Sequence, residues 1–240
     1  MMFYDFAERI RALERQEEKD IIPLNAGNTN ISVPGCAIQA MSEYLRKNKK
    51  AQYLPAAGLP ELREKIAERE NCPVENILVG PGSKYLIYGL FSTLGLKNKK
   101  ILVPQPHWPA YGLIAKKLGL TVEAIETSLD NRWDFGELNF DESNILMLCN
   151  PLNPTSTTYG HDLIERTIES AKQKSVSVII DEAYKGLAYN KIKDYDAIRV
   201  RSFSKEFNME NFRLAYIVAP ENLVEKMTEF NQIKDRKSVV

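Results

Sequence analysis

The 240-residue sequence contains three cysteines, two histidines and no apolar run approaching the roughly 18 residues of a membrane-spanning helix. Cys36, Cys72 and Cys149 are odd in number and far apart, which argues against a disulfide framework or a metal-binding spacing. His107 and His161 are isolated and lack the neighbours of a metal site, so no metal is expected. Lys+Arg and Asp+Glu balance at 32 each, and this balance excludes an electrostatic footprint for nucleic acid or an anionic membrane.

The remaining composition indicates a soluble globular protein, with 44% hydrophobic and 27% charged residues. The first twenty residues are too charged for a secretory signal, and the low cysteine content fits a reducing compartment, so a cytoplasmic protein is expected. The tripeptide DFG at 134–136 does not indicate a kinase, because no nucleotide loop or catalytic-loop motif accompanies it. Internal repeats and low-complexity segments are absent from the sequence.

From residue 77 onward, short apolar runs alternate with stretches of helical periodicity. This alternation predicts a three-layer α/β/α fold around a mostly parallel seven-stranded sheet. The last strand follows its predecessor without room for a helical crossover, so we expect this one strand to be antiparallel. The predicted strands are 77–79, 101–103, 121–125, 145–149, 176–181, 197–202 and 214–219, and the predicted helices are 3–18, 36–48, 59–70, 83–95, 109–118, 161–174 and 222–233.

Ligands of such sheets bind beyond the carboxyl ends of the strands, so the residues at these ends are the first candidates for a site. The strand 77–79 ends in GPGSK (80–84), where two glycines, the Ser83 hydroxyl and a helix N-terminus favour an anion. A plain strand-to-helix turn explains the same residues equally well, and neither the dinucleotide nor the Walker pattern is satisfied. In PQPHWPAY (104–111), Trp108 either packs in the core or presents a flat face to a ligand ring.

Polar residues also follow the later strands. The prolines of CNPLNPT (149–155) leave Asn150 and Asn153 able to hydrogen-bond inward. Asp181 directly follows an apolar run, and a partly buried carboxylate there needs a cationic or hydrogen-bonding partner. Tyr184 comes three residues later. In RSFSKEFNMENFRLAY (201–216), Lys205 stands beside small hydroxyl residues, and an arginine follows eight positions later.

Four segments together resemble the class I/II aminotransferases, which are fold type I enzymes that use pyridoxal phosphate (PLP). They are YLPAAGLPELREKIA (53–67), CNPLNPT (149–155), VIIDEAYKGLAY (178–189) and RSFSKEFNMENFRLAY (201–216). The resemblance extends from about residue 20 to the end of the sequence. It implies an N-terminal arm and helix at 1–45, the large PLP-binding domain at 46–221, and at 222–240 the start of a helix leading to a C-terminal small domain that this sequence lacks.

The resemblance also implies a role for each candidate residue. Lys205 would form the Schiff base with the aldehyde of PLP and then act as general acid and base. Asp181 would face the pyridine nitrogen and favour its protonated form. Tyr184 and Asn153 would hydrogen-bond the phenolic oxygen.

The phosphate would be held by Arg213, whose planar fork suits that group, together with Ser202 and the turn after the first strand. Trp108 would stack on the ring, and Tyr53 would reach the phosphate of a neighbouring subunit, which implies a homodimer with shared active sites. The turn contributes Gly82, Ser83 and Lys84.

The implied function is an aminotransferase that moves an amino group between an amino acid (or amine) and a 2-oxo acid. The alternatives are another fold type I PLP enzyme (a decarboxylase, lyase or cyclase) and a truncated PLP-binding module without turnover. The sequence does not specify the substrate, because the family's carboxylate clamp lies in the C-terminal domain. The glycine that usually follows NPT in the family is Ser156 here. We also expect the apolar face of 222–233 to be exposed: Leu223, Val224, Met227 and Phe230.

Overall fold

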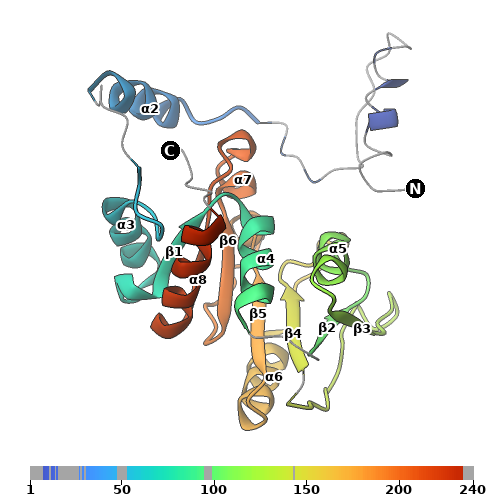
Figure 1. Ribbon diagram of the computed structural model, residues 1–240. Helices are drawn as coiled ribbons and strands as arrows, with labels where there is room; N and C mark the ends of the chain where they lie inside the picture. Colours follow the sequence, from blue (N-terminus) through green and yellow to red (C-terminus); the bar gives the residue numbers. More distant parts are fainter. Residues whose placement is uncertain are drawn as a thin grey trace. The chain divides into compact units, whose positions relative to one another are not determined.

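The computed structural model describes residues 8–10, 12, 13, 15, 27, 29, 31–47, 53–94, 99–142 and 144–234 (Figure 1). The chain divides into two compact units, residues 1–31 and 32–240. Most of the first unit, and with it most of the helix predicted at 3–18, lies outside the described residues. The second unit contains the sheet and all of the candidate site residues.

The elements of the second unit follow the predicted alternation of strands and helices. All seven predicted strands are confirmed, as are the helices predicted from residue 36 onward, with boundaries that differ by at most two residues. The strands are β1 (Ile77–Gly80), β2 (Lys100–Pro104), β3 (Thr121–Ile125), β4 (Asn144–Cys149), β5 (Ser177–Asp181), β6 (Ile198–Ser202) and β7 (Ala215–Val218). The helices are α2 (Gly35–Lys47), α3 (Pro60–Glu70), α4 (Ser83–Thr93), α5 (Ala110–Lys117), α6 (His161–Gln173), α7 (Phe203–Glu206) and α8 (Glu221–Lys234), with 3₁₀ turns η1 (Val74–Asn76), η2 (Lys185–Leu187) and η3 (Glu210–Phe212).

The strands form one sheet in the order β1-β7-β6-β5-β4-β2-β3. Neighbouring strands are parallel except at β7, which is antiparallel to both β1 and β6. Only α7 and η3 lie between β6 and β7, so the chain turns back beside β6 instead of crossing over the sheet. The predicted mixed sheet with one antiparallel strand is therefore confirmed.

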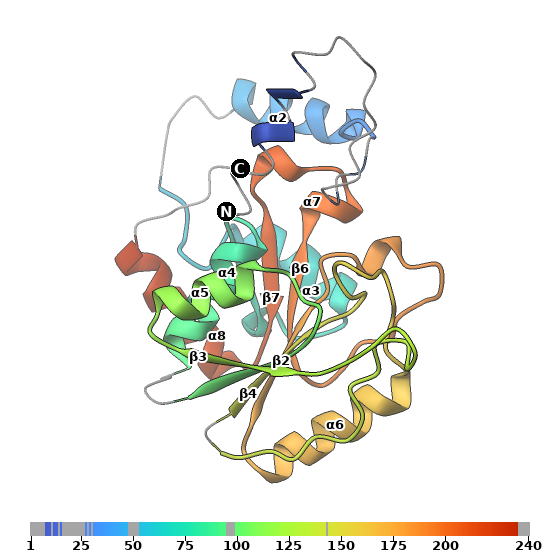
Figure 2. The same cartoon turned by 90° about the vertical axis from the view of Figure 1, so that its right-hand side faces the viewer.

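Helices cover both faces of the sheet: α4, α5 and α8 lie on one side, and α3 and α6 on the other (Figure 2). The period of two in β1 matches this arrangement. Leu78 joins the large core beneath α4, whereas Ile77 and Val79 pack with Ile66 and Ala67 of α3. The two faces of β1 are therefore covered by different helices, α4 on one side and α3 on the other.

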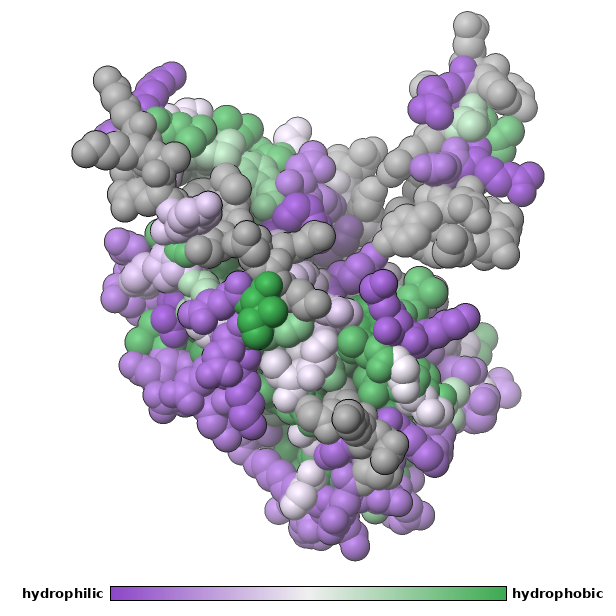
Figure 3. Space-filling model, in the orientation of Figure 1, coloured by the Kyte–Doolittle hydropathy of each residue, from purple (hydrophilic) through white to green (hydrophobic). Residues whose placement is uncertain are grey.

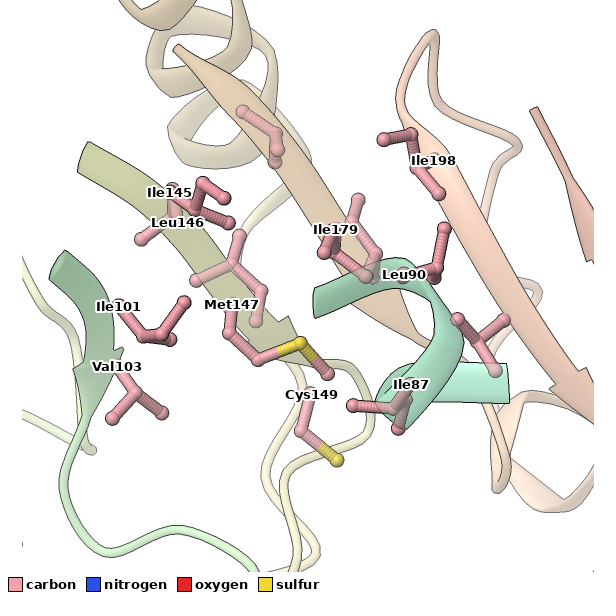
Figure 4. Close-up of a cluster of buried hydrophobic side chains, with 14 of the residues drawn as sticks. Ile87, Leu90, Ile101, Val103, Ile145, Leu146, Met147, Cys149, Ile179 and Ile198 are labelled. Atoms are coloured by element: carbon pink, nitrogen blue, oxygen red, sulfur yellow. The ribbon is translucent and has the colours of Figure 1, made fainter. Parts of the chain in front are cut away.

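The large core lies between α4 and the central strands (Figure 4). Ile87 and Leu90 of α4 are fully buried among the side chains of β4 and β5, including Met147 and Ile179. Because β4 and β5 are covered on both faces, their apolar runs are continuous rather than alternating. This packing fixes the position of α4, whose N-terminus borders the candidate site.

The expectation of an exposed apolar face on α8 is wrong. Leu223, Val224 and Met227 are all buried, because α8 packs against α4. Gly89 of α4 permits this close approach, since a Cβ there would lie only 2.8 Å from the Met227 methyl carbon. Phe230 also packs on α4, with its ring centroid 5.9 and 5.8 Å from the rings of Tyr85 and Tyr88.

Helix α2 carries three exposed large apolar side chains, Ile38, Tyr44 and Leu45, and Figure 3 shows hydrophobic surface over this helix. No residue of α2 is buried. Within the described part of the chain, no helix is both long and apolar enough to span a membrane.

Candidate active site

The polar ends of four strands meet at one edge of the sheet. Asp181 at the end of β5 pairs with Cys149 at the end of β4, and β6 extends beyond it to Ser202. Ala215, the first residue of antiparallel β7, aligns with both Ser202 and Gly80. The turn after β1, the residues after β4 and β5, and the segment after β6 therefore lie along a common edge.

Asp181 is deeply buried, with 3% of its surface exposed. Its Oδ2 accepts a hydrogen bond from the Tyr111 hydroxyl at 2.7 Å, and its Oδ1 accepts one from the Ala183 N–H at 3.0 Å. Burial raises the pKa of Asp181 to about 6, although both hydrogen bonds act in the opposite direction. The sequence-based expectation of a buried carboxylate with a hydrogen-bonding partner agrees with this geometry.

Tyr111 is a site residue that the sequence analysis missed. It is fully buried near the start of α5, and burial together with the charge of Asp181 raises its pKa well above the usual tyrosine value. Its ring meets that of Trp108 edge to face, with centroids 5.5 Å apart. The spacing of three residues from Trp108 into a predicted helix was the available signal, because it places both rings on neighbouring turns.

Trp108 is partly buried and contacts the turn after β1. The Lys84 ammonium lies over its ring, 5.3 Å from the centroid. A ligand ring that stacks on Trp108 would therefore use the opposite face or displace Lys84. The predicted stacking role stays a prediction, but the contact joins Trp108 to the predicted anion-binding turn.

Lys205 lies in α7, directly after β6, with 17% of its side chain exposed. Its Nζ is 3.3 Å from Oε1 of Glu210. Ser202 caps the short α7, because its Oγ accepts a hydrogen bond from the Ser204 N–H at 3.1 Å. The hydroxyl proton of Ser202 is not used in this cap and can still be donated to another acceptor.

Gly82 and Arg213 come from opposite ends of the sequence and lie in contact. A Cβ on Gly82 would be 2.2 Å from Nη2 of Arg213, so only glycine fits beside the guanidinium at this position, where φ is +91°. Nη1 of Arg213 donates to the main-chain oxygen of Glu210 at 2.9 Å. The Gly82 N–H already donates to the Gly80 carbonyl at 2.8 Å, so Gly82 contributes space for the arginine rather than a donor. The donor at this turn is the N–H of Ser83, the first residue of α4.

Tyr184 follows β5, is partly buried and interacts electrostatically with both Asp181 and Glu210. Burial raises its pKa to about 12, and the charges of Asp181 and Glu210 contribute in the same direction. Asn153 is partly buried in the turn after β4, where the N–H of neighbouring Asn150 donates to the Asp181 main-chain oxygen at 2.9 Å.

Two sequence positions behave differently from the rest of the cluster. Tyr53 is 84% exposed, and its predicted contact with a partner subunit stays a prediction. Ser156 adopts the left-handed conformation with φ of 62°, and its N–H donates to Leu152 at 2.8 Å. The turn that glycine usually makes in the family is thus made here by a serine.

A second group of charges lies on the α3 face of β6, and we call it the Glu70 network. Nη1 of Arg199 is 2.7 Å from Glu70 and 2.6 Å from Asp194, and the Tyr216 hydroxyl donates to Glu70 at 2.6 Å. Arg201 lies beside Glu70 at 3.5 Å. The network consists of Arg69, Glu70, Glu182, Lys185, Asp194, Arg199, Arg201, Glu206 and Tyr216.

The Glu70 network reaches the candidate site through Glu206, the residue after Lys205. Nη2 of Arg201 is 3.0 Å from Glu206, which also pairs with Arg69. Gly186 in η2 leaves room for the Glu206 carboxylate. The helical turn that bears Lys205 is therefore held by ion pairs to β6 and α3.

Comparison with solved structures identifies the fold as that of the aspartate aminotransferases. The Thermus thermophilus aspartate aminotransferase with maleate superimposes with a TM-score of 0.88 at 23% identity, over 97% of this chain and 66% of that one. The Thermotoga maritima aspartate aminotransferase gives a TM-score of 0.88 at 21% identity, over 98% and 68%. At these identities the likeness establishes the fold alone.

Residues 19–233 match the family model described as aminotransferase class I and II, and the chain belongs to this family. It is 31% identical over 232 residues to the aspartate aminotransferase of Thermococcus kodakarensis, covering 95% of this chain and 61% of that protein. It is 32% identical over 200 residues to the aspartate aminotransferase of Sulfurisphaera tokodaii, covering 74% and 50%. The chain thus spans about half to three fifths of the length of these two relatives.

The family uses PLP, and the residues present are suited to that cofactor. The space at Gly82 that a Cβ would fill keeps the Arg213 guanidinium beside the N-terminus of α4, as an anion requires. The buried Asp181 carboxylate matches a ring nitrogen, and Lys205 supplies an amine at the same edge. The set of side chains therefore fits a phosphate, a pyridine nitrogen and an aldehyde.

Proposed function

We propose that this chain binds PLP and belongs to an aminotransferase that moves an amino group between an amino acid and a 2-oxo acid. The observation that carries the proposal is the meeting of Asp181, Lys205 and Arg213 at one sheet edge, with Gly82 against the arginine. Each of these three charged side chains matches a different chemical group of the cofactor.

When bound, PLP supplies an electron-accepting ring on which bonds at the α-carbon of an amino acid can be broken. Asp181, with a pKa of about 6, is ionised above that pH and would then stabilise a protonated ring nitrogen. Tyr111 would hold this carboxylate in position through its 2.7 Å hydrogen bond. Tyr184, with a pKa of about 12, retains its proton near neutral pH and would donate it to the phenolic oxygen beside Asn153.

The remaining residues would anchor the cofactor. Lys205 would bond its aldehyde and carry the proton that moves during the exchange of amino groups. Arg213, the Ser202 hydroxyl and the Ser83 N–H would hold the phosphate, with Lys84 close by. Trp108 would cover the ring on the face opposite Lys84.

The assembly is also part of the proposal. The exposed Tyr53 supports a homodimer in which this side chain reaches the phosphate in the partner subunit. We propose the large PLP-binding domain at 46–221, preceded by an arm at 1–45, in a cytoplasmic enzyme. Since the relatives are longer, turnover by the 240 residues alone is expected to be poor, because substrate binding would involve residues outside them.

The test is to add PLP to the purified chain, record its absorption spectrum, reduce with borohydride and map the peptides by mass spectrometry. The expected result is a reducible absorption band and phosphopyridoxyl on Lys205, with neither in Lys205→Ala. The exposed Lys191→Ala serves as the matched control and should label like the wild type. Labelling scattered over surface lysines would contradict the proposal. With the longer enzyme, a 2-oxo acid and pyridoxamine phosphate as products would distinguish transamination from decarboxylation or elimination.

A further inference from the structure

Glu210 contacts both cations that the proposed function assigns to PLP. Its carboxylate oxygen Oε1 lies 3.3 Å from Lys205 Nζ, and its main-chain oxygen accepts the 2.9 Å hydrogen bond from Arg213 Nη1. Glu210 begins η3, between the lysine of α7 and the arginine that precedes β7.

The contact between Glu210 and Lys205 is partly shielded from water. The exposed fraction is 17% for the Lys205 side chain and 32% for that of Glu210. Coulombic interactions at such a place are stronger than between fully exposed charges and are less screened by salt. The charge of Glu210 also reaches Tyr184, on which it acts in the same direction as Asp181.

A phosphate-bearing ligand would bring further negative charge to this cluster. Arg213 has no carboxylate within ion-pair distance among the residues that the structure describes, whereas Lys205 already faces one. The Glu210 carboxylate therefore offsets part of the positive charge that would attract the phosphate, and like charges in one partly buried site repel each other.

We propose that Glu210 is a counter-ion of Lys205 that weakens the binding of phosphate-bearing ligands at this site, an inference that rests on the proposed cofactor function. Glu210→Gln removes the negative charge while it keeps the size of the side chain and an acceptor for Lys205. For unit charges about 3–6 Å apart that are screened almost as in water, as expected beside the exposed Arg213, the Coulomb energy corresponds to a change in affinity of about three- to tenfold.

The experiment compares the wild type with Glu210→Gln in titrations with inorganic phosphate, PLP and pyridoxal, which carries the aldehyde but no phosphate. Calorimetry gives the dissociation constant for phosphate, and the Schiff-base absorption gives those for PLP and pyridoxal. We expect the variant to bind phosphate and PLP about three- to tenfold more tightly, with a smaller gain for pyridoxal, which reacts with the Lys205 amine but lacks the phosphate. The difference should shrink as ionic strength rises. Glu225→Gln, an exposed position on α8, is the control for the change in net charge.

Two results would overturn the inference. One is unchanged affinity for phosphate in Glu210→Gln; the other is an equal gain for PLP and pyridoxal, which would mean that Glu210 acts on the amine alone. Failure of the proposed function is a separate result, namely no borohydride-stable adduct on Lys205 in either protein. The phosphate titration tests the charge effect even then, because it does not depend on the aldehyde.

Discussion

The charged side chains of this chain occupy two regions that differ in how completely they are paired. In the Glu70 network, each arginine faces at least one carboxylate, and Arg199 and Arg201 are almost fully buried. At the candidate site, the hydrogen bond that Arg213 makes within the described residues goes to a main-chain carbonyl, and Asp181 is paired with neutral donors.

The difference separates charges that stabilise the fold from charges that the proposed cofactor would pair. A buried ion is costly unless partners within the chain compensate it, and in the Glu70 network they do. Among the described residues of the sheet edge, Asp181 is buried with no cation at ion-pair distance, whereas Arg213 is exposed, so water can solvate its guanidinium. The uncompensated carboxylate makes this edge less favourable for stability, and a ligand with a cationic group beside Asp181 would complete it.

The largest predicted loss of stability follows from removing Glu70 from the Glu70 network. Glu70→Ala removes partners from Arg199 and Tyr216 and leaves a buried guanidinium less compensated. We expect a loss of about 3–5 kcal/mol in the free energy of unfolding, measured by denaturant titration. Glu68→Ala, which removes only the exposed pair with Lys65, should cost less than about 1 kcal/mol. Equal losses in the two variants would contradict the expected difference between buried and exposed ion pairs.

At Asp181, by contrast, we predict that a substitution raises the free energy of unfolding. The pKa of Asp181 is raised from 3.8 to about 6, so its contribution to stability is fully present below pH 3.8 and is lost as the pH rises through 6. Asp181→Asn should therefore stabilise the cofactor-free chain by about 1–3 kcal/mol at pH 7.5, since Tyr111 can accept from the new amide. The gain should diminish in denaturant titrations between pH 6 and 4, while PLP affinity falls. Destabilisation at pH 7.5 would contradict this prediction.

A smaller effect is expected at Gly82, where the turn after β1 contacts Arg213. Gly82→Ala should cost about 1–2 kcal/mol, because its backbone is in a region that alanine rarely adopts and its Cβ would displace Arg213. Phosphate affinity should fall about tenfold, the loss of one charge-assisted hydrogen bond, as measured by calorimetry. Gly112→Ala, in an open position of α5, should instead stabilise by about 0.5–1 kcal/mol and leave phosphate binding unchanged.

The strands and the direction of the antiparallel one were predictable because both depend on local patterns in the sequence. Apolar runs such as ILMLC at 145–149 mark strands, and the short connection before 214–219 marks the antiparallel one. The candidate site was largely predictable because its residues follow directly after those strands.

The partners of these residues were not predictable from spacing alone. The arginines of IRVRS (198–202) point toward α3, and Arg199 meets Glu70, which is 129 positions away in sequence. Helix α8 was expected to be exposed, but it is buried because Gly89 on α4 leaves a groove for Met227. Such contacts depend on three-dimensional packing between elements that the linear sequence keeps far apart.

The position of β7 has a consequence for the order in which the protein is made. Among the described strands, β1 is at the edge of the sheet and its one neighbour is β7, although more than 130 residues separate Gly80 from Ala215. At about 5–20 residues per second, a ribosome needs on the order of ten seconds to synthesise that interval. During this time β1 has no neighbouring strand. The arrival of β7 would then bring the Gly82 turn and Arg213 together in a single late event of folding on the ribosome.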